Sequence, residues 1–134
     1  MAGALKVRFR VDFANQCSVG VGKIELLEGI ARTGSLSQAA RRMRMSYRRA
    51  WLLLADLNLS FDQPVVHTST GGRGGGGAVL TPFGARLVAA YRKLESSVQP
   101  LADSCLHDVG RRVAATRPKR NIRPVPLKRK TAPS

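Results

Sequence analysis

The fold is decided by Gly34-Ser-Leu-Ser-Gln-Ala-Ala-Arg-Arg-Met-Arg-Met-Ser-Tyr-Arg-Arg-Ala-Trp51, a stretch with the pattern of two short helices joined by a tight turn. Ser35 is a good N-cap for the first helix, and Gln38 follows at the spacing of a capping box. Ser46 is a second N-cap and opens the second helix. This layout predicts a helix-turn-helix, whose second helix enters the DNA major groove by its N-terminal end.

The distribution of arginines in this stretch favours nucleic-acid binding. Apolar residues recur at helical spacing in the first helix, at Leu36, Ala39, Ala40 and Met43. Basic residues lie on or beside the opposite face and in the first turn of the second helix, at Arg41, Arg42, Arg44, Arg48 and Arg49. The alternative is a pair of core helices with a solvated arginine face. We favour DNA binding because the arginines crowd the turn instead of spreading evenly.

The segment before this stretch predicts one strand and one helix. Apolar and charged residues alternate from Leu5 to Phe13, which is typical of a half-buried strand. A single strand cannot stand alone, so it pairs either with later strands or with a second subunit. Residues 15–22 are turn-like. Helical spacing follows over residues 23–32, with Ile24, Leu27, Ile30 and Ala31 as the apolar stripe and Gly34 as a C-terminal cap.

The segment after the turn predicts a recognition helix and a wing. The helix runs over about residues 47–58, and its buried stripe is Ala50, Trp51, Leu54, Leu57 and Phe61. Two strands, residues 64–70 and 78–80, flank a loop in which Arg73 is the only residue besides glycine between Gly71 and Gly77. A guanidinium on such a loop can bind phosphate or enter a minor groove. The alternative is a solvated hairpin loop.

The last helix is expected to begin at Thr81-Pro82, a threonine N-cap followed by proline at the first helical position. Its apolar stripe covers about 20 residues and consists of Leu87, Val88, Tyr91, Leu94, Val98 and Leu101, with Pro100 as a point where the helix kinks or ends. A stripe of this length exceeds what one small domain covers, so we expect part of it to form a dimer seam. The alternative is packing against its own domain.

Charge and composition suggest a domain plus a basic tail. The chain has 134 residues, a formal net charge of +15 and a sequence pI of about 11.5. We expect residues 1–108 to form the domain and residues 109–134 a disordered tail that binds phosphates without sequence preference. Nucleic acid is the favoured polyanion and a membrane surface the competitor. No membrane-spanning run or secretory signal is visible, so a cytoplasmic protein is expected.

Several chemical functions find no support in the sequence. Cys17 and Cys105 are far apart in the sequence and are expected to be reduced thiols; the alternative is a disulfide between them. No metal-ligand spacing is present, and no cofactor is predicted. The glycine run 72–77 satisfies G-x-G-x-x-G trivially, without the strand–loop–helix unit that dinucleotide binding needs. No nucleophile–base pair or paired carboxylate is visible, so we do not expect an enzyme.

Together these motifs resemble a known family. Gly34-Ser-Leu-Ser-Gln-Ala-Ala40, Ser46-Tyr-Arg-Arg-Ala-Trp51, the glycine-rich stretch Thr70–Thr81 and Gly84 are similar to the N-terminal DNA-binding domain of ModE, the molybdate-responsive repressor, a winged helix related to the LysR type. The resemblance covers about residues 4–105. It implies a homodimer joined through the first strand and last helix, with the recognition helix starting at Ser46 and the wing at residues 70–77. Arg49 stands where the family has a small residue.

The resemblance also sets a limit. ModE proteins carry C-terminal oxyanion-binding modules that sense molybdate, whereas this chain continues into the basic tail. We therefore expect no molybdate binding by this chain, and regulation of molybdenum genes is an implication of the resemblance alone.

The sequence thus predicts an α+β, mainly α, winged helix-turn-helix that regulates transcription, with repression as the expected direction and double-stranded DNA as the partner. The expected DNA-binding residues are Ser35, Gln38, Arg41, Ser46, Tyr47, Arg48, Arg49, Thr70, Gly72 and Arg73. The runner-up is a sequence-indifferent nucleoid- or RNA-associated protein whose tail supplies most of the affinity. A third class is a dimerisation or adaptor module without an operator.

Overall fold

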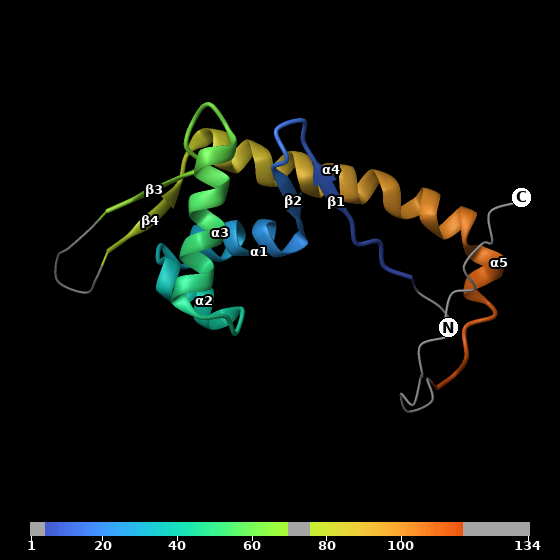
Figure 1. Cartoon of the computed structure of the whole chain (residues 1–134). Coiled ribbons are helices and arrows are strands. Elements are labelled where there is room, and N and C mark those ends of the chain that lie inside the picture. The colour runs from blue at the N-terminus through green and yellow to red at the C-terminus, as the bar shows by residue number, and fades with distance from the viewer. Residues whose placement is uncertain (1–4, 70–75, 117–134) are drawn as a thin grey trace, which may run out of the picture.

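The computed structural model describes residues 5–69 and 76–116. Its elements are β1 (Arg10–Asp12), β2 (Ser18–Gly20), α1 (Val21–Thr33), α2 (Leu36–Arg42), α3 (Tyr47–Ser60), β3 (Val66–Thr68), β4 (Ala78–Leu80), α4 (Pro82–Cys105) and α5 (His107–Gly110). The described strands form two antiparallel pairs, β1–β2 and β3–β4. Helices α1–α3 gather at one end of α4, with β3–β4 beside them (Figure 1). The predicted α+β winged helix-turn-helix is confirmed.

The first strand has a partner that the sequence reading missed. Residues 15–22 were expected to be turn-like, but β2 lies within them and pairs with β1 in the register Val11↔Val19. Two backbone hydrogen bonds close the hairpin, from the N–H of Phe13 to the carbonyl of Cys17 and from the N–H of Gln16 to that of Phe13. A strand of three residues is too short to show alternation, which is why the pattern gave no signal. The partner strand lies in the same chain.

The core lies between α1, α2, α3 and the two hairpins. Helix α1 contributes four buried residues, Ile24, Leu26, Leu27 and Ile30. Leu26 was not in the predicted stripe, and Ala31, which was, is exposed. Helices α1 and α2 approach closely at Gly29, where an added Cβ would lie 3.1 Å from the Cβ of Ala39. Side chains from α3 complete the core with Ala50, Leu54 and Leu57.

Two large aromatic residues that were expected to face the core, Trp51 and Phe13, are exposed instead. Trp51 was expected in the core, but 52% of it is exposed on α3, and Phe13 is 41% exposed after β1. The core side of α3 is filled by Ala50, Leu54 and Leu57, and Trp51 lies about 100° around the helix from Ala50. Phe13 begins the turn of the first hairpin, where its ring makes an edge-on contact with Phe61.

The predicted helix caps are confirmed, but the capping box at Ser35 and Gln38 is not, because the N–H of Ser35 donates to the hydroxyl of Thr33 at 3.2 Å and not to the side chain of Gln38. Gly34 has φ +69° and its N–H donates to the carbonyl of Ile30, which ends α1 in a left-handed conformation. The hydroxyls of Ser35, Ser46 and Thr81 each accept from the backbone N–H three residues on, at 3.2, 3.1 and 2.9 Å. Each hydroxyl satisfies a donor that a helix N-terminus leaves without a partner.

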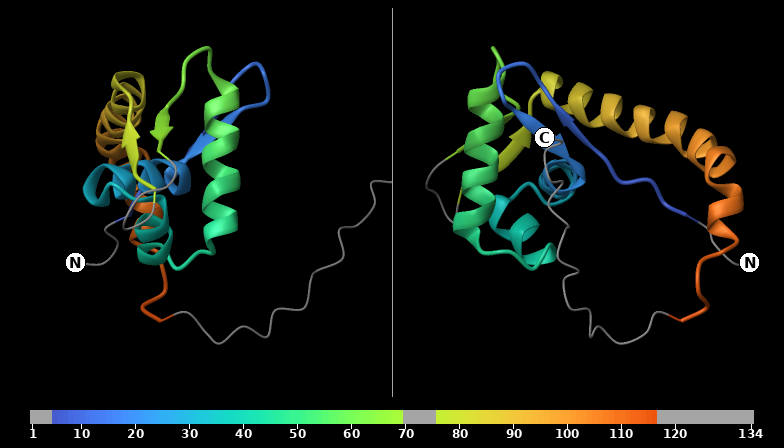
Figure 2. Two further views of the ribbon diagram at one scale, coloured as in Figure 1. Left: turned by 90° about the vertical axis from the view of Figure 1, so that its left-hand side faces the viewer. Right: turned by 45° about the vertical axis from the view of Figure 1, so that its right-hand side comes forward.

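Helix α4 extends beyond the winged helix, and residues 5–9 run along it (Figure 2). Pro100 does not end α4, which continues to Cys105. The amide side chain of Gln99 binds the backbone at both Leu5 and Val7, with N···O distances of 2.9 and 3.0 Å. The Tyr91 hydroxyl donates to the carbonyl of Phe9 at 2.8 Å, and the two rings stack with centroids 4.7 Å apart. This segment alternates as predicted, although only Arg10–Asp12 is a paired strand.

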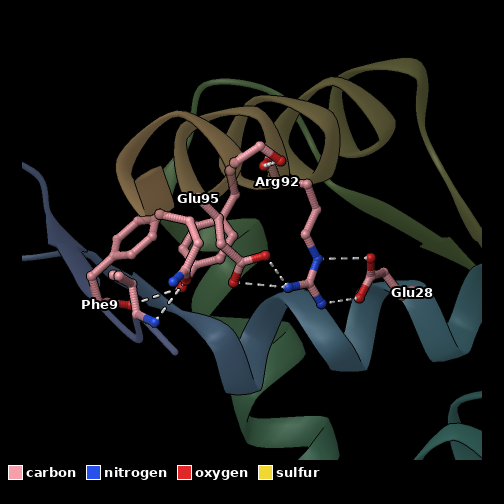
Figure 3. A network of polar contacts seen from close by, with 8 residues as sticks. Phe9, Glu28, Arg92 and Glu95 are labelled. Atoms are coloured by element: carbon pink, nitrogen blue, oxygen red, sulfur yellow. Dashed lines mark hydrogen bonds and ion pairs between the residues drawn. The ribbon is translucent and has the colours of Figure 1, made fainter. Parts of the chain in front are cut away.

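A polar network joins α4 to α1 (Figure 3). The guanidinium of Arg92 makes a bidentate contact with the carboxylate of Glu28 in α1, with N···O distances of 2.6 and 3.1 Å. It also binds the carboxylate of Glu95 at 2.9 Å. The two carboxylates raise the pKa of the Arg92 guanidinium, the hydrogen bonds to Glu28 contributing most. Tyr91 and Arg92 are consecutive residues of α4. The contact of Arg92 with Glu28 and the stacking of Tyr91 on Phe9 therefore hold α4 within a single turn of the helix.

Both cysteines are free thiols: Cys17 is buried in the core and Cys105 is exposed at the end of α4. In residues 5–69 and 76–116, no helix is both long and apolar enough to cross a bilayer. The short helix α5 lies across the predicted boundary between residues 108 and 109.

Candidate nucleic-acid interface

The turn between α2 and α3 has a defined hydrogen-bonded geometry. The N–H of Met45 donates to the carbonyl of Ala40 at 3.0 Å, and that of Arg44 to the carbonyl of Arg41 at 3.1 Å. This is the Schellman pattern, in which the residue after the C-cap is left-handed. Arg44 holds that position with φ 55°, and it is one of two described non-glycine residues with positive φ. The chain therefore reverses tightly with an arginine at its most constrained point.

The first turn of α3 presents polar side chains to solvent. Ser46 caps the helix through the N–H of Arg49. Tyr47 is 57% exposed, and Arg48 and Arg49 are exposed as well, whereas Ala50 next to them is fully buried. The buried side fixes the rotation of the helix, so these side chains project away from the core. An N-terminus with its backbone donors and partial positive charge is a favourable place for a phosphate.

The charged residues of the segment that forms this turn all have the same sign. Residues 29–55 contain six arginines and no acidic residue. Arg41, Arg42, Arg44, Arg48 and Arg49 are all exposed. The ion pairs found among the described residues are Arg10–Asp12, Lys23–Asp56, Arg92–Glu28 and Arg92–Glu95, and none involves these five arginines. A cluster of uncompensated guanidinium groups creates a positive potential that attracts a polyanion.

The wing strands are attached directly to the helix-turn-helix. Strands β3 and β4 pair in the register His67↔Val79, and the N–H of Ala78 donates to the carbonyl of Gly34 at 2.9 Å. That bond ties the base of the hairpin to the junction between α1 and α2. At the outer end of the described strands, Ser69 and Gly77 exchange backbone and side-chain hydrogen bonds. Three predicted DNA-binding residues, Thr70, Gly72 and Arg73, lie outside the described residues.

Asn58 is a positioning residue that the sequence reading did not identify. Its side-chain oxygen accepts from the N–H of Val65 at 2.8 Å and of Val66 at 3.2 Å, and its amide donates to the carbonyl of Val66 at 3.2 Å. One side chain thus joins the end of α3 to the start of β3. Its partners lie seven and eight residues away across a loop, and a lone asparagine in a helix carries no sequence signal for them.

The predicted residues divide between the two ends of α2. Arg41, Ser46, Tyr47, Arg48 and Arg49 come together around the turn and the start of α3 (Figure 1). Ser35 and Gln38 lie at the other end of α2, where the Ser35 hydroxyl is engaged in the cap. Gln38 is exposed, and Ser35 is partly buried.

Comparison with known proteins agrees with this geometry. Residues 21–85 match the model of the bacterial regulatory helix-turn-helix proteins of the LysR family. The chain is 45% identical over 86 residues to the molybdenum-pterin-binding protein MopB of Rhodobacter capsulatus, which is 64% of this chain and 32% of MopB. It is 42% identical over 86 residues to the DNA-binding transcriptional dual regulator ModE of Escherichia coli K12, and 43% identical over 81 residues to the molybdenum transport protein ModE of Azotobacter vinelandii. These stretches are 64% and 60% of this chain.

The chain spans about a third of the length of these relatives, with shares of 32%, 32% and 30%. The matched part contains the helix-turn-helix, the wing strands and the start of α4. Residues 21–85 therefore form a LysR-type helix-turn-helix domain, and the N-terminal part of the chain is homologous to the ModE and MopB proteins.

Proposed function

We propose that this chain is a DNA-binding transcriptional regulator that reads base edges with the first turn of α3. One observation carries the proposal: Tyr47, Arg48 and Arg49 are exposed directly after the capped N-terminus of α3, within a segment, residues 29–55, that contains no acidic residue. A helix so placed and so charged suits the major groove of DNA, which admits one α-helix.

Each exposed side chain has a proposed role. Arg48 and Arg49 contact base edges, because a guanidinium can donate bidentate hydrogen bonds to the O6 and N7 of guanine. Ser46 and Tyr47 bind a phosphate or a base at the helix N-terminus. Arg41, Arg42 and Arg44 bind the DNA backbone and set the orientation of the domain. Ser35, Gln38 and the wing residues Thr70, Gly72 and Arg73 complete the proposed contact set.

We assign a separate, sequence-independent role to the basic segment 109–134. From Gly110 onward it carries nine basic residues and no acidic one. Contacts between such charges and phosphates release counterions, so they raise affinity for every sequence and make it fall steeply with salt. The tail therefore increases affinity and association rate, and α3 supplies the preference for one sequence.

The proposed assembly is a homodimer joined through the first strand and α4. Leu94 and Leu101 lie on the predicted stripe of α4 and remain 43% and 63% exposed in the single chain. A second copy would cover them and would present two α3 helices to two half-sites of one duplex.

The names of the relatives suggest what is regulated. MopB is named for molybdenum-pterin and the Azotobacter protein for molybdenum transport. We propose genes of molybdenum metabolism as the targets, with repression as the expected direction. The Escherichia coli relative is named a dual regulator, so for that protein both directions apply.

Selection of the purified chain against random duplex DNA at near-physiological salt tests the function. We expect enrichment of a two-fold symmetric motif with half-sites one helical turn, or a multiple of it, apart. Replacing Arg48 or Arg49 with Ala should weaken binding to the selected duplex by about 1–3 kcal/mol for each bidentate contact that is lost. Binding to a scrambled duplex should change little.

The matched control is Lys128→Ala, which removes one positive charge from the tail and should weaken both duplexes alike. Equal losses on both duplexes for Arg48→Ala and Arg49→Ala would remove these residues from the set of base readers. If no motif is enriched and binding fades steeply with salt, the chain is the sequence-indifferent binder that its net charge of +15 also permits.

A further inference from the structure

The side of α3 that carries Trp51 faces the wing hairpin. Asn58 binds Val65 and Val66 at the start of β3, so its position marks that side of the helix. Trp51 precedes Asn58 by seven residues, which places it within about 20° of the same side. Tyr47 lies one turn before Trp51. Two aromatic side chains, 57% and 52% exposed, therefore follow one another along the flank of α3 next to the hairpin.

The size of the groove determines what this flank would meet. An α-helix with its side chains is about 10–12 Å across, and the major groove of B-DNA is about 12 Å wide. A helix that enters the groove therefore fills its width, and its two flanks face the two sugar–phosphate strands. Because α3 would enter the groove by its N-terminal end, residues further along the helix lie nearer the mouth of the groove. Trp51 lies roughly 6 Å along the helix axis from Tyr47, which is less than the depth of the groove, about 8.5 Å. Its indole is thus within reach of the strand on the hairpin side.

The chemistry of an indole matches that of a DNA strand. Its ring is apolar and its Nε1–H is a donor only. A strand alternates apolar deoxyribose carbons with phosphate acceptors. The surrounding surface is complementary in charge, because residues 29–55 contain no acidic residue and the neighbouring Arg48 and Arg49 are exposed. A half-exposed tryptophan on this surface gains burial and a hydrogen bond when the strand covers it.

We propose that Trp51 contacts DNA, with its ring packed on a deoxyribose of the hairpin-side strand and its Nε1–H donated to an adjoining phosphate. The contact is a positioning contact that does not read bases, because every nucleotide offers the same two groups. It fixes how deep and at what angle α3 sits, so that Arg48 and Arg49 reach the base edges. This inference rests on the proposed function.

The chain itself provides the probe, because Trp51 is its only tryptophan. We would measure acrylamide quenching of the intrinsic fluorescence of the full chain, free and saturated with the selected duplex or with a scrambled duplex. Quenching should fall several-fold on both duplexes. Trp51→Ala should weaken binding to both by a similar factor, on the order of tenfold for a lost hydrogen bond to a charged group. Trp51→Phe, which keeps a ring without the donor, should lie between.

The matched control is Leu59→Ala, on the same helix two turns further and 86% exposed. It should bind both duplexes as the wild type does. Because Trp51 is half exposed, its variants should keep the wild-type circular dichroism and melting temperature, so that a loss of binding is not a loss of fold.

Three outcomes separate this inference from the proposed function. If the wild type selects a motif but Trp51 stays equally quenchable in the complex, or Trp51→Ala binds normally, the inference is wrong and the function stands. If Trp51→Ala weakens only the selected duplex, and replacing its thymines with uracil removes that difference, the ring contacts a thymine methyl and the strand assignment is wrong. If the wild type selects nothing, the proposed function fails, whatever the fluorescence shows.

Discussion

Arg44 occupies a left-handed conformation in the turn between α2 and α3, at a position where helices commonly place glycine. A side chain there destabilises the fold by about 1–2 kcal/mol relative to glycine. Strain of this kind is often kept at functional positions. In this turn the strained residue adds a guanidinium to the arginine cluster beside the start of α3.

Arg44→Gly should therefore separate stability from binding. We expect the free energy of unfolding to rise by about 1 kcal/mol, because glycine adopts a positive φ without a steric penalty. Affinity for DNA should fall on selected and scrambled duplexes alike, because one phosphate contact is lost. Urea denaturation and binding titrations measure the two effects. A stability gain with unchanged affinity would show that Arg44 does not contact DNA, and Arg44→Ala, which loses the charge and keeps the strain, is the control.

Tyr91 links the stability of the fold to pH. Burial raises the pKa of its hydroxyl above the ordinary value of 10.0, and the negative charge of Glu95 adds to the effect. The neutral hydroxyl donates to the carbonyl of Phe9. A raised pKa in the folded state means that this stabilisation is complete below pH 10 and is lost as the pH rises through the folded-state pKa.

Comparison of Tyr91→Phe with the wild type should show this dependence. At pH 8 the wild type should be more stable by about 1 kcal/mol, the contribution of one buried hydrogen bond. The difference should shrink as the pH rises above 10, because Tyr91 ionises more readily in the unfolded chain than in the folded protein. Groups that titrate in both proteins cancel in the difference. Urea midpoints between pH 8 and 11 measure it, and a constant gap across this range would contradict the assignment.

At the scale of elements, the direction of α4 relative to α1 depends on a small number of contacts. Arg92 bridges Glu28 of α1 and Glu95 of α4, and the Phe9–Tyr91 stack lies next to it along the helix. The three charged side chains are 34%, 30% and 21% exposed, so water screens the ion pairs in part. The contribution of these ion pairs to the free energy of unfolding is therefore that of partly exposed pairs with good bidentate geometry.

Arg92→Met should lower the free energy of unfolding by about 1 kcal/mol, because it leaves two carboxylates facing each other without a cation. The loss should be smaller in 1 M salt, where charge interactions are screened. Thermal or urea unfolding at two salt concentrations measures both effects. Arg10→Met is the control, since Arg10 and Asp12 are 67% and 60% exposed and their pair should contribute nothing measurable. If the two variants behave alike, Arg92 does not hold α4 against α1.

At the scale of the whole molecule, α4 carries apolar surface that this chain leaves open. Exposed apolar residues continue beyond the core along α4 and the following segment, at Leu94, Leu101, Leu106, Val109 and Val113. The N-terminal segment 5–9 binds α4 at Tyr91 and Gln99. The uncovered part of the stripe is what the proposed dimer would bury.

Leu101→Asp should convert the proposed dimer to a monomer, because a carboxylate buried in an apolar seam has no partner there. Sedimentation equilibrium at micromolar concentration measures the mass. Leu59→Asp on α3 is the matched control, because Leu59 is even more exposed at 86% but lies away from the stripe. A monomeric wild type, or two variants with the same mass, would contradict a seam on α4.

Local sequence alone determined the helix-turn-helix. The starts of α2, α3 and α4 at Ser35, Ser46 and Thr81, and the end of α1 at Gly34, follow from capping chemistry that acts within three or four residues. The wing strand β4 and the alternation of residues 5–12 were also predicted, because the period of a strand is visible within a few neighbouring residues. The DNA-binding roles of the arginines stay predictions, and Thr70, Gly72 and Arg73 lie outside the described residues.

Tertiary structure alone decided the features that depend on contacts between distant residues. Strand β2 exists because β1 pairs with it, although its three residues carry no period of their own. Trp51 is exposed because Ala50, Leu54 and Leu57 already fill the core side of α3, and an apolar residue type does not state which side it lies on. Asn58 and Arg92 became positioning residues only when the fold brought β3 and Glu28 next to them, across up to 64 positions of sequence. Such contacts are properties of packing, and no local pattern encodes them.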